Sequence, residues 1–241
     1  MGIDCEWPPI LGRNSAAQKL TLLQIASFDS CFLIDVLKLK DSKHWTRFTE
    51  KILNSKSITK IGFGFHNDLS LIKTSFPLET LFNPQKIFDL SKVFEFVLSE
   101  YQNLIPDDAI AQARRKDLKG LSKCVFLLFG KPLDKSEQFS DWSRRPLREE
   151  QVKYAALDAF CLIDIFEELR KRFTENNYDF EEFVENFLNG RLKRVEKRLK
   201  TNDCSKETDF KCEVTEVKEF RAVADTMLQG MTPLSYILIQ F

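Results

Sequence analysis

The chain has 241 residues, 43% of them hydrophobic and 12% aromatic, so it is long enough to bury a substantial core. Lysine plus arginine and aspartate plus glutamate each number 36, so the net charge is zero and the composition neither indicates nor excludes a polyanionic partner. The two histidines, His44 and His66, leave little for a zinc site or a serine–histidine–aspartate triad, so any metal chemistry must depend on carboxylates.

Three apolar stretches rich in branched residues open the chain, over residues 1–7, 20–28 and 30–36. They predict a meander of three strands. Residues 42–54 show the apolar spacing of a helix, and residues 58–65 predict a further strand, followed directly by a helix that begins near Asn67.

The middle of the chain predicts a short strand over residues 86–90, a helix over 91–101 and a polar, irregular loop over 102–116. Residues 117–129 predict a helix that ends at Gly130. The strongest helical pattern covers residues 147–173, with acidic residues in its first turn and basic residues in its last. Strands followed by alternating strands and helices predict an α/β domain with a mixed sheet.

The C-terminal part predicts an amphipathic helix over residues 177–200, whose second half carries six basic residues and one acid. We expect a solvated charged face there, with attraction of RNA as the alternative. Residues 201–217 are polar and linker-like, and residues 218–241 begin like a buried strand.

The six cysteines form no CxxC pair, so we expect reduced thiols. No segment approaches the roughly 20 apolar residues of a membrane helix, and no signal peptide is recognisable. We therefore expect an intracellular protein, cytoplasmic or nuclear, with no membrane partner.

Four carboxylates and one tyrosine are candidates for the chemistry. Asp4 and Glu6 are two positions apart on the first predicted strand, so their side chains share a face. Asp68 opens a helix directly after a strand, and Asp158 lies in an apolar helical segment with Tyr154 one turn before it. Converging carboxylates repel one another until divalent cations neutralise them, and two such cations can catalyse phosphodiester hydrolysis.

Each of these residues also has a structural explanation. A DxE pair is common at a solvated strand end, and an acid such as Asp68 can stabilise a helix N-terminus. Asp158 could bond to a neighbouring helix, and Tyr154 could be a core tyrosine with a satisfied hydroxyl. Their occurrence together favours a metal site, and we leave His66 unassigned.

The segments GIDCEW, IGFGFHNDLSLI and LDKSEQFSDWSRRPLREEQVKYAALDA resemble the three exonuclease motifs of the RNase D and Werner-type DEDD family. The spacing of Tyr154 and Asp158 resembles its tyrosine subclass, DEDDy, and the sequence is most similar to the Nibbler-like, mutator-type exonucleases. The resemblance covers residues 2–173. It implies an α/β fold with a ribonuclease H-like mixed β-sheet flanked by helices, and a C-terminal helical extension.

The resemblance also implies a division into domains. Residues 1–176 would form the 3′-5′ exonuclease domain with a shortened N-terminal strand, and residues 177–217 a basic helix and linker. Residues 218–241 resemble the truncated start of a PIN-like C-terminal domain. Because the first strand lacks the apolar residues that normally precede its motif, we expect it to be weakly anchored.

The activity implied is metal-dependent 3′-5′ hydrolysis of phosphodiester bonds at single-stranded nucleic-acid 3′ ends, with release of nucleoside monophosphates. Two Mg²⁺ or Mn²⁺ ions are implied: Asp4 would bridge them, Glu6 and Asp158 would complete the first, and Asp68 would support the second largely through water. Tyr154 would position the nucleophile.

The Nibbler-like resemblance further implies RNA as the substrate, 3′ trimming of small RNAs and an Argonaute-type partner protein. The alternatives are a non-catalytic module that binds nucleic acid or protein, and a Werner-like DNA exonuclease.

Five further residues are candidates for substrate contacts. We expect Phe63 and Phe65 to stack on bases without reading sequence, and Lys135, Arg144 and Arg145 to contact the phosphate backbone. The two arginines could equally pair with the acids that open the following helix.

Overall fold

One mixed sheet organises the chain. The computed structural model describes residues 1–9, 19–39, 44–76, 81–192 and 236–240. Within these ranges six strands pair in the order β5-β4-β1-β2-β3-β6. The antiparallel meander consists of β1 (Gly2–Glu6), β2 (Leu22–Ala26) and β3 (Ser30–Asp35). Beside β1, β4 (Lys60–Gly62) and β5 (Ile87–Asp89) continue in parallel, and β6 (Tyr236–Gln240) pairs antiparallel with β3.

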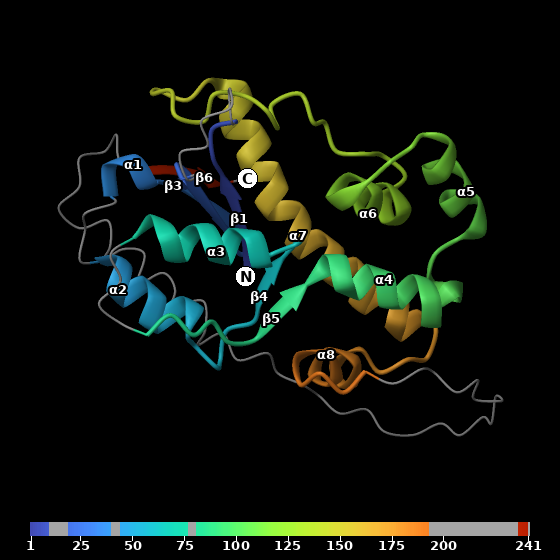
Figure 1. Ribbon diagram of the computed structural model, residues 1–241. Coiled ribbons are helices and arrows are strands. Elements are labelled where there is room, and N and C mark those ends of the chain that lie inside the picture. Colours follow the sequence, from blue (N-terminus) through green and yellow to red (C-terminus); the bar gives the residue numbers. More distant parts are fainter. Residues whose placement is uncertain (10–18, 40–43, 77–80, 193–235, 241) are drawn as a thin grey trace.

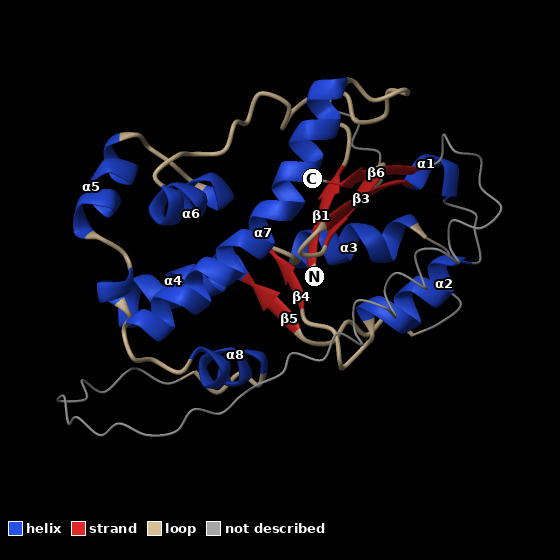
Figure 2. Cartoon of the chain, turned by 180° about the vertical axis from the view of Figure 1, so that it is seen from behind, coloured by secondary structure: helices blue, strands red, loops and turns tan. Residues whose placement is uncertain are grey.

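Helices cover both faces of this sheet (Figures 1 and 2). One face carries α1 (Val36–Leu39), α2 (His44–Phe48), the π-helix η1 (Thr49–Leu53) and α3 (His66–Ser75). The other face carries α4 (Leu90–Glu100), α6 (Gly120–Phe129), the long α7 (Glu149–Glu175) and α8 (Phe180–Leu188). The sequence prediction of a mixed sheet flanked by helices, with a helical extension, is confirmed.

Both faces of β2 and β3 carry buried apolar residues because each face of the sheet meets a helical layer. Ile3 and Ile25 belong to the core beside α2 and α3, whereas Leu22 and Leu33 belong to the core beneath α7.

Cys5, Cys31, Cys124 and Cys161 are buried free thiols, as expected. Among the described helices, none is long and apolar enough to cross a membrane.

The first strand is held from both sides. β1 pairs with β2 along its whole length, and the backbone N–H of Ile61 in β4 donates to the carbonyl of Met1 at 2.8 Å. Ile3 and Cys5 are buried on one face of this strand. The weak anchoring expected from the sequence is therefore not what the structure shows.

Two connecting segments differ from the sequence prediction. Residues 102–116 are not an irregular loop, because they form the 3₁₀ turn η2 (Gln102–Leu104) and α5 (Asp107–Arg115). α5 has acids in its first turn and arginines in its last, a charge placement that stabilises a helix, and it buries Ala113 against the core.

The helix expected over residues 177–200 ends at Leu188, because Gly190 turns the backbone to a φ of 63° that an α-helix does not continue. Most of the basic half, over 193–200, lies outside the described residues, as do the linker 201–217 and residues 218–235. The domain division proposed from the sequence stays a prediction.

Candidate active site

The carboxylates of β1 and α7 meet because these two elements approach closely. Asp4 and Glu6 lie with Gly2 on the face of β1 that α7 covers. A methyl group added at Gly2 would lie 2.6 Å from the carbonyl oxygen of Ala159. Only glycine permits this approach of helix and strand. Asp158 precedes Ala159, and one carboxylate oxygen from each of Asp4, Glu6 and Asp158 lies within 4.8 Å of the others.

Asp68 reaches the same cavity from the first turn of α3. The chain arrives there through a tight turn after β4, in which Gly64 has a φ of 63° and donates its N–H to Asp89 at 2.9 Å. Asp68 lies outside the group of three oxygens within 4.8 Å, yet the charge of Asp4 acts on it. This placement suits a supporting ligand at the edge of the carboxylate group.

Burial raises the pKa of all four carboxyl groups. Desolvation is the largest cause in each, and the pKa rises to about 6 for Asp4, about 8 for Asp158, about 9 for Asp68 and about 10 for Glu6. The charge of Asp4 raises the pKa of the other three further. The cluster therefore retains protons at neutral pH unless cations neutralise it, and its hard oxygen donors suit Mg²⁺ or Mn²⁺.

Tyr154 lies one turn before Asp158 on α7, and its hydroxyl donates a hydrogen bond to that carboxylate. Burial, followed by the charge of Asp158, raises the pKa of Tyr154 well above its usual value, so the hydroxyl stays protonated and acts as a donor rather than as a base. The fully buried Trp142 packs against the tyrosine ring, with a centroid separation of 5.9 Å.

A cavity of about 650 Å³ opens above these groups. The four carboxylates and Tyr154 line it together with the aromatic side chains Trp7, Phe63 and Phe139 and the cation Lys135. An acidic site surrounded by flat apolar surfaces can hold metal ions and also a planar base.

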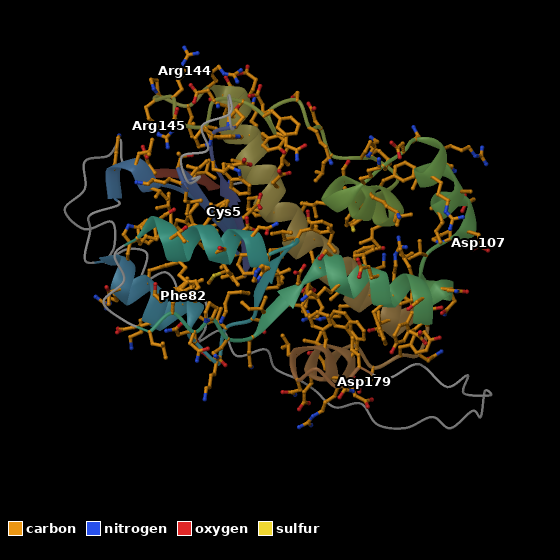
Figure 3. The ribbon with its side chains drawn as sticks, viewed as in Figure 1. Cys5, Phe82, Asp107, Arg144, Arg145 and Asp179 are labelled. Carbon is orange, nitrogen blue, oxygen red and sulfur yellow. The ribbon has the colours of Figure 1, made fainter. Side chains whose placement is uncertain are left out.

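Three of the five predicted substrate contacts remain compatible with the structure. Phe63 and Lys135 line the cavity, and Arg144 is exposed at the outer edge of the molecule (Figure 3). Phe65 is fully buried in the core beneath β1, so it has no face for a base, and its predicted stacking role is wrong. Arg145 donates to Asp35 and to three backbone carbonyls, so its guanidinium is engaged within the protein rather than available to a phosphate.

Four residues beside the site were not among those predicted from the sequence. Trp7 and Phe139 line the cavity, Asp89 holds the turn before α3, and Gln24 lies directly opposite Asp4 in the β1–β2 register. Gln24 is fully buried and its amide has no hydrogen-bond partner among the described residues. A polar residue within the apolar strand LLQIA was the available signal.

The fold and the site together define the class. A mixed sheet between helical layers, with four carboxylates gathered in one cavity from β1, α3 and α7, is the arrangement of an α/β nuclease whose donors suit divalent cations. Comparison with known families identifies the particular group: the model described as 3′-5′ exonuclease matches residues 1–174. The chain belongs to this family, which confirms the resemblance inferred from the motifs.

Individual relatives point in the same direction. The "Exonuclease mut-7 homolog" of Aedes aegypti is 31% identical over 196 residues, which cover 78% of this chain and 26% of that protein. The human protein of the same name is 34% identical over 175 residues, covering 70% of this chain and 20% of its own length. The chain thus spans about a quarter or less of these relatives.

A solved structure, the Aedes aegypti Nibbler EXO domain, superimposes with a TM-score of 0.62 and 29% identity, covering 77% of this chain and 84% of that one.

Proposed function

We propose that this chain is a metal-dependent 3′-5′ exonuclease that hydrolyses the terminal phosphodiester bond of single-stranded RNA and releases nucleoside monophosphates. The observation that carries the proposal is the meeting of Asp4, Glu6 and Asp158 within 4.8 Å, with Asp68 in the same cavity. Membership of the 3′-5′ exonuclease family supports it.

The carboxylates would hold two Mg²⁺ or Mn²⁺ ions. Asp4 would contribute to holding both ions, Glu6 and Asp158 would hold the first, and Asp68 would support the second. When bound, the ions would activate the attacking water and stabilise the leaving oxygen. The protonated Tyr154 hydroxyl, already hydrogen-bonded to Asp158, lies where it can orient that water.

RNA as substrate, trimming of small-RNA 3′ ends and an Argonaute-type partner belong to the same proposal. They are supported by the likeness to the mut-7 homologs and to the Nibbler EXO domain.

The test is a time course on matched 5′-labelled RNA and DNA oligomers with a free 3′ hydroxyl, in Mg²⁺ or Mn²⁺. Asp158→Asn should abolish stepwise shortening because it removes a ligand charge without changing the side-chain shape. Asp164→Asn is the matched control, since Asp164 lies on the same helix, is exposed and is outside the cavity.

Full activity of the Asp158→Asn protein would contradict the proposed site. Binding of the oligomer by the wild type without any shortening would support the non-catalytic module instead. Faster shortening of DNA than of RNA would favour the Werner-like alternative.

A further inference from the structure

Phe139 is an exposed aromatic side chain at the site. It is 78% exposed, the largest exposed fraction among the large apolar side chains of the described residues. A single exposed apolar residue is common on protein surfaces and needs no explanation by itself. Phe139 differs from the similarly exposed Phe28 and Leu81 because it lines the cavity that contains the carboxylates.

The backbone around Phe139 is held by contacts that do not involve its ring. Glu137 forms an ion pair with Arg148, which precedes α7. The Gln151 amide, 1% exposed, donates to the hydroxyl of Ser140 at 2.8 Å and to the carbonyl of Asp141 at 3.1 Å. Anchors on both sides fix the position of Phe139, while its ring adds little to the core. The loop therefore presents a preorganised aromatic surface, and the exposed ring is not needed to hold the loop in place.

The surroundings of the ring indicate the kind of ligand. Lys135, four residues earlier in the same loop, also lines the cavity and supplies a positive charge. A single-stranded nucleic acid offers both complementary parts, a phosphate for the cation and a base for the ring. Stacking of bases on aromatic side chains tolerates any sequence, which suits an enzyme that removes successive nucleotides.

We propose that Phe139 stacks on a base of the single strand on the 5′ side of the bond to be cleaved, and so sets the affinity for the strand. The carboxylates that would act on the terminal phosphodiester lie within the cavity, whereas the exposed ring faces the solvent from which the rest of the strand must enter. This inference rests on the proposed exonuclease function, and it assigns a substrate contact to a residue outside the carboxylate group.

The experiment pairs a change in the protein with a change in the strand. Affinity is measured by fluorescence anisotropy with Ca²⁺ in place of Mg²⁺, and shortening is measured in parallel with Mg²⁺. Oligoribonucleotides carry one abasic nucleotide, moved stepwise from the 3′ end. Phe139→Ala should weaken binding of the intact strand by about tenfold, raise KM similarly and leave kcat nearly unchanged.

The distinguishing result is coupling. At one position on the 5′ side of the cleaved bond, removal of the base should weaken binding to the wild type about tenfold and to Phe139→Ala hardly at all. Phe139→Trp should retain the affinity. Phe129→Ala is the matched control, since Phe129 is also exposed but lies outside the cavity.

The inference would be overturned if Phe139→Ala bound the strand as tightly as the wild type, or if its loss of affinity were the same for every abasic strand. The proposed function would stand in either case, provided that the wild type shortens the oligomer. A wild type that neither binds nor shortens the oligomer would overturn both.

Discussion

Arg145 and Asp35 form a bidentate ion pair that joins the segment before α7 to the end of β3. The guanidinium donates to the two carboxylate oxygens at 2.8 and 3.0 Å, and its other N–H groups donate to the carbonyls of Thr21, Trp142 and Arg144. The pair holds the chain where it turns into the helix that carries Tyr154 and Asp158.

Arg145→Met should lower the free energy of unfolding by about 2–4 kcal/mol, because it leaves Asp35 with little solvent and without its cation. The pair is only partly accessible, with side chains 21% and 11% exposed, so screening reduces the loss only modestly. Urea denaturation measures the change. Arg144→Met, at the exposed neighbouring position, should be nearly neutral, and equal effects of the two variants would argue against the structural role.

The metal-free protein should lose stability as the pH rises from about 5 to about 9. Burial raises the pKa of the four carboxyl groups to between about 6 and about 10, above their ordinary values of 3.8 and 4.5, so the native state binds more protons than the unfolded state in this range. Unfolding then releases protons, and the free energy of unfolding falls as the pH rises.

Urea denaturation in EDTA across this range checks the sign. Mn²⁺ should restore stability most strongly at the alkaline end, where the carboxylates repel one another. Asp158→Asn should flatten the pH dependence in EDTA, and stability that increases toward pH 9 would contradict the raised pKa values of the buried carboxyl groups.

Tyr154→Phe should reduce kcat by about 10²- to 10³-fold, the range for loss of one preorganised hydrogen-bonding group, with little change in KM. The ring that packs against Trp142 remains, so the thermal melting temperature should change little. Tyr178→Phe removes a hydroxyl that bonds to Asn103 away from the cavity and serves as the control. Equal kcat values for the two variants would remove Tyr154 from the chemistry.

Asp89 should matter for both stability and activity, because one of its oxygens accepts from Gly64 N–H, Ser91 N–H and the Ser91 hydroxyl at 2.8–3.0 Å. Asp89→Ala should cost about 1–3 kcal/mol of stability and reduce the affinity for Mn²⁺, since the turn that leads to Asp68 loses its anchor.

Calorimetric titration with Mn²⁺ measures the second effect. Asp89→Asn keeps an acceptor and should recover most of the affinity, whereas Ser91→Ala removes only one of the three contacts. Unchanged Mn²⁺ binding in Asp89→Ala would show that the turn needs no such anchor.

Local patterns in the sequence were sufficient to predict the carboxylates as candidate ligands and to predict the helix that carries two of the site residues. Asp4 and Glu6 follow from strand alternation, and α7 has both an apolar face and favourable end charges. The gathering of these groups in one cavity required the order of motifs as well, because no local pattern brings β1 to α7.

The wrong predictions for Phe65 and Arg145 have a common physical origin, because both depend on long-range contacts or on the local backbone conformation. Phe63 and Phe65 looked equivalent as alternate positions of a strand, but β4 ends at Gly62 and the positive φ of Gly64 sends one ring to the cavity and the other to the core. The partner of Arg145 lies 110 positions away, so its neighbours in the sequence suggested only a phosphate contact or an ion pair with the acids that open the following helix.

The ligands of the site come from distant parts of the chain, and this affects the protein during its synthesis. β1 precedes the other described elements, whereas α7 follows α1 to α6. A nascent chain therefore displays Asp4, Glu6 and Asp68 well before Asp158 and Tyr154 leave the ribosome. Until then the nascent chain lacks the complete set of candidate ligands, so the proposed metal site cannot form before α7 has folded against β1.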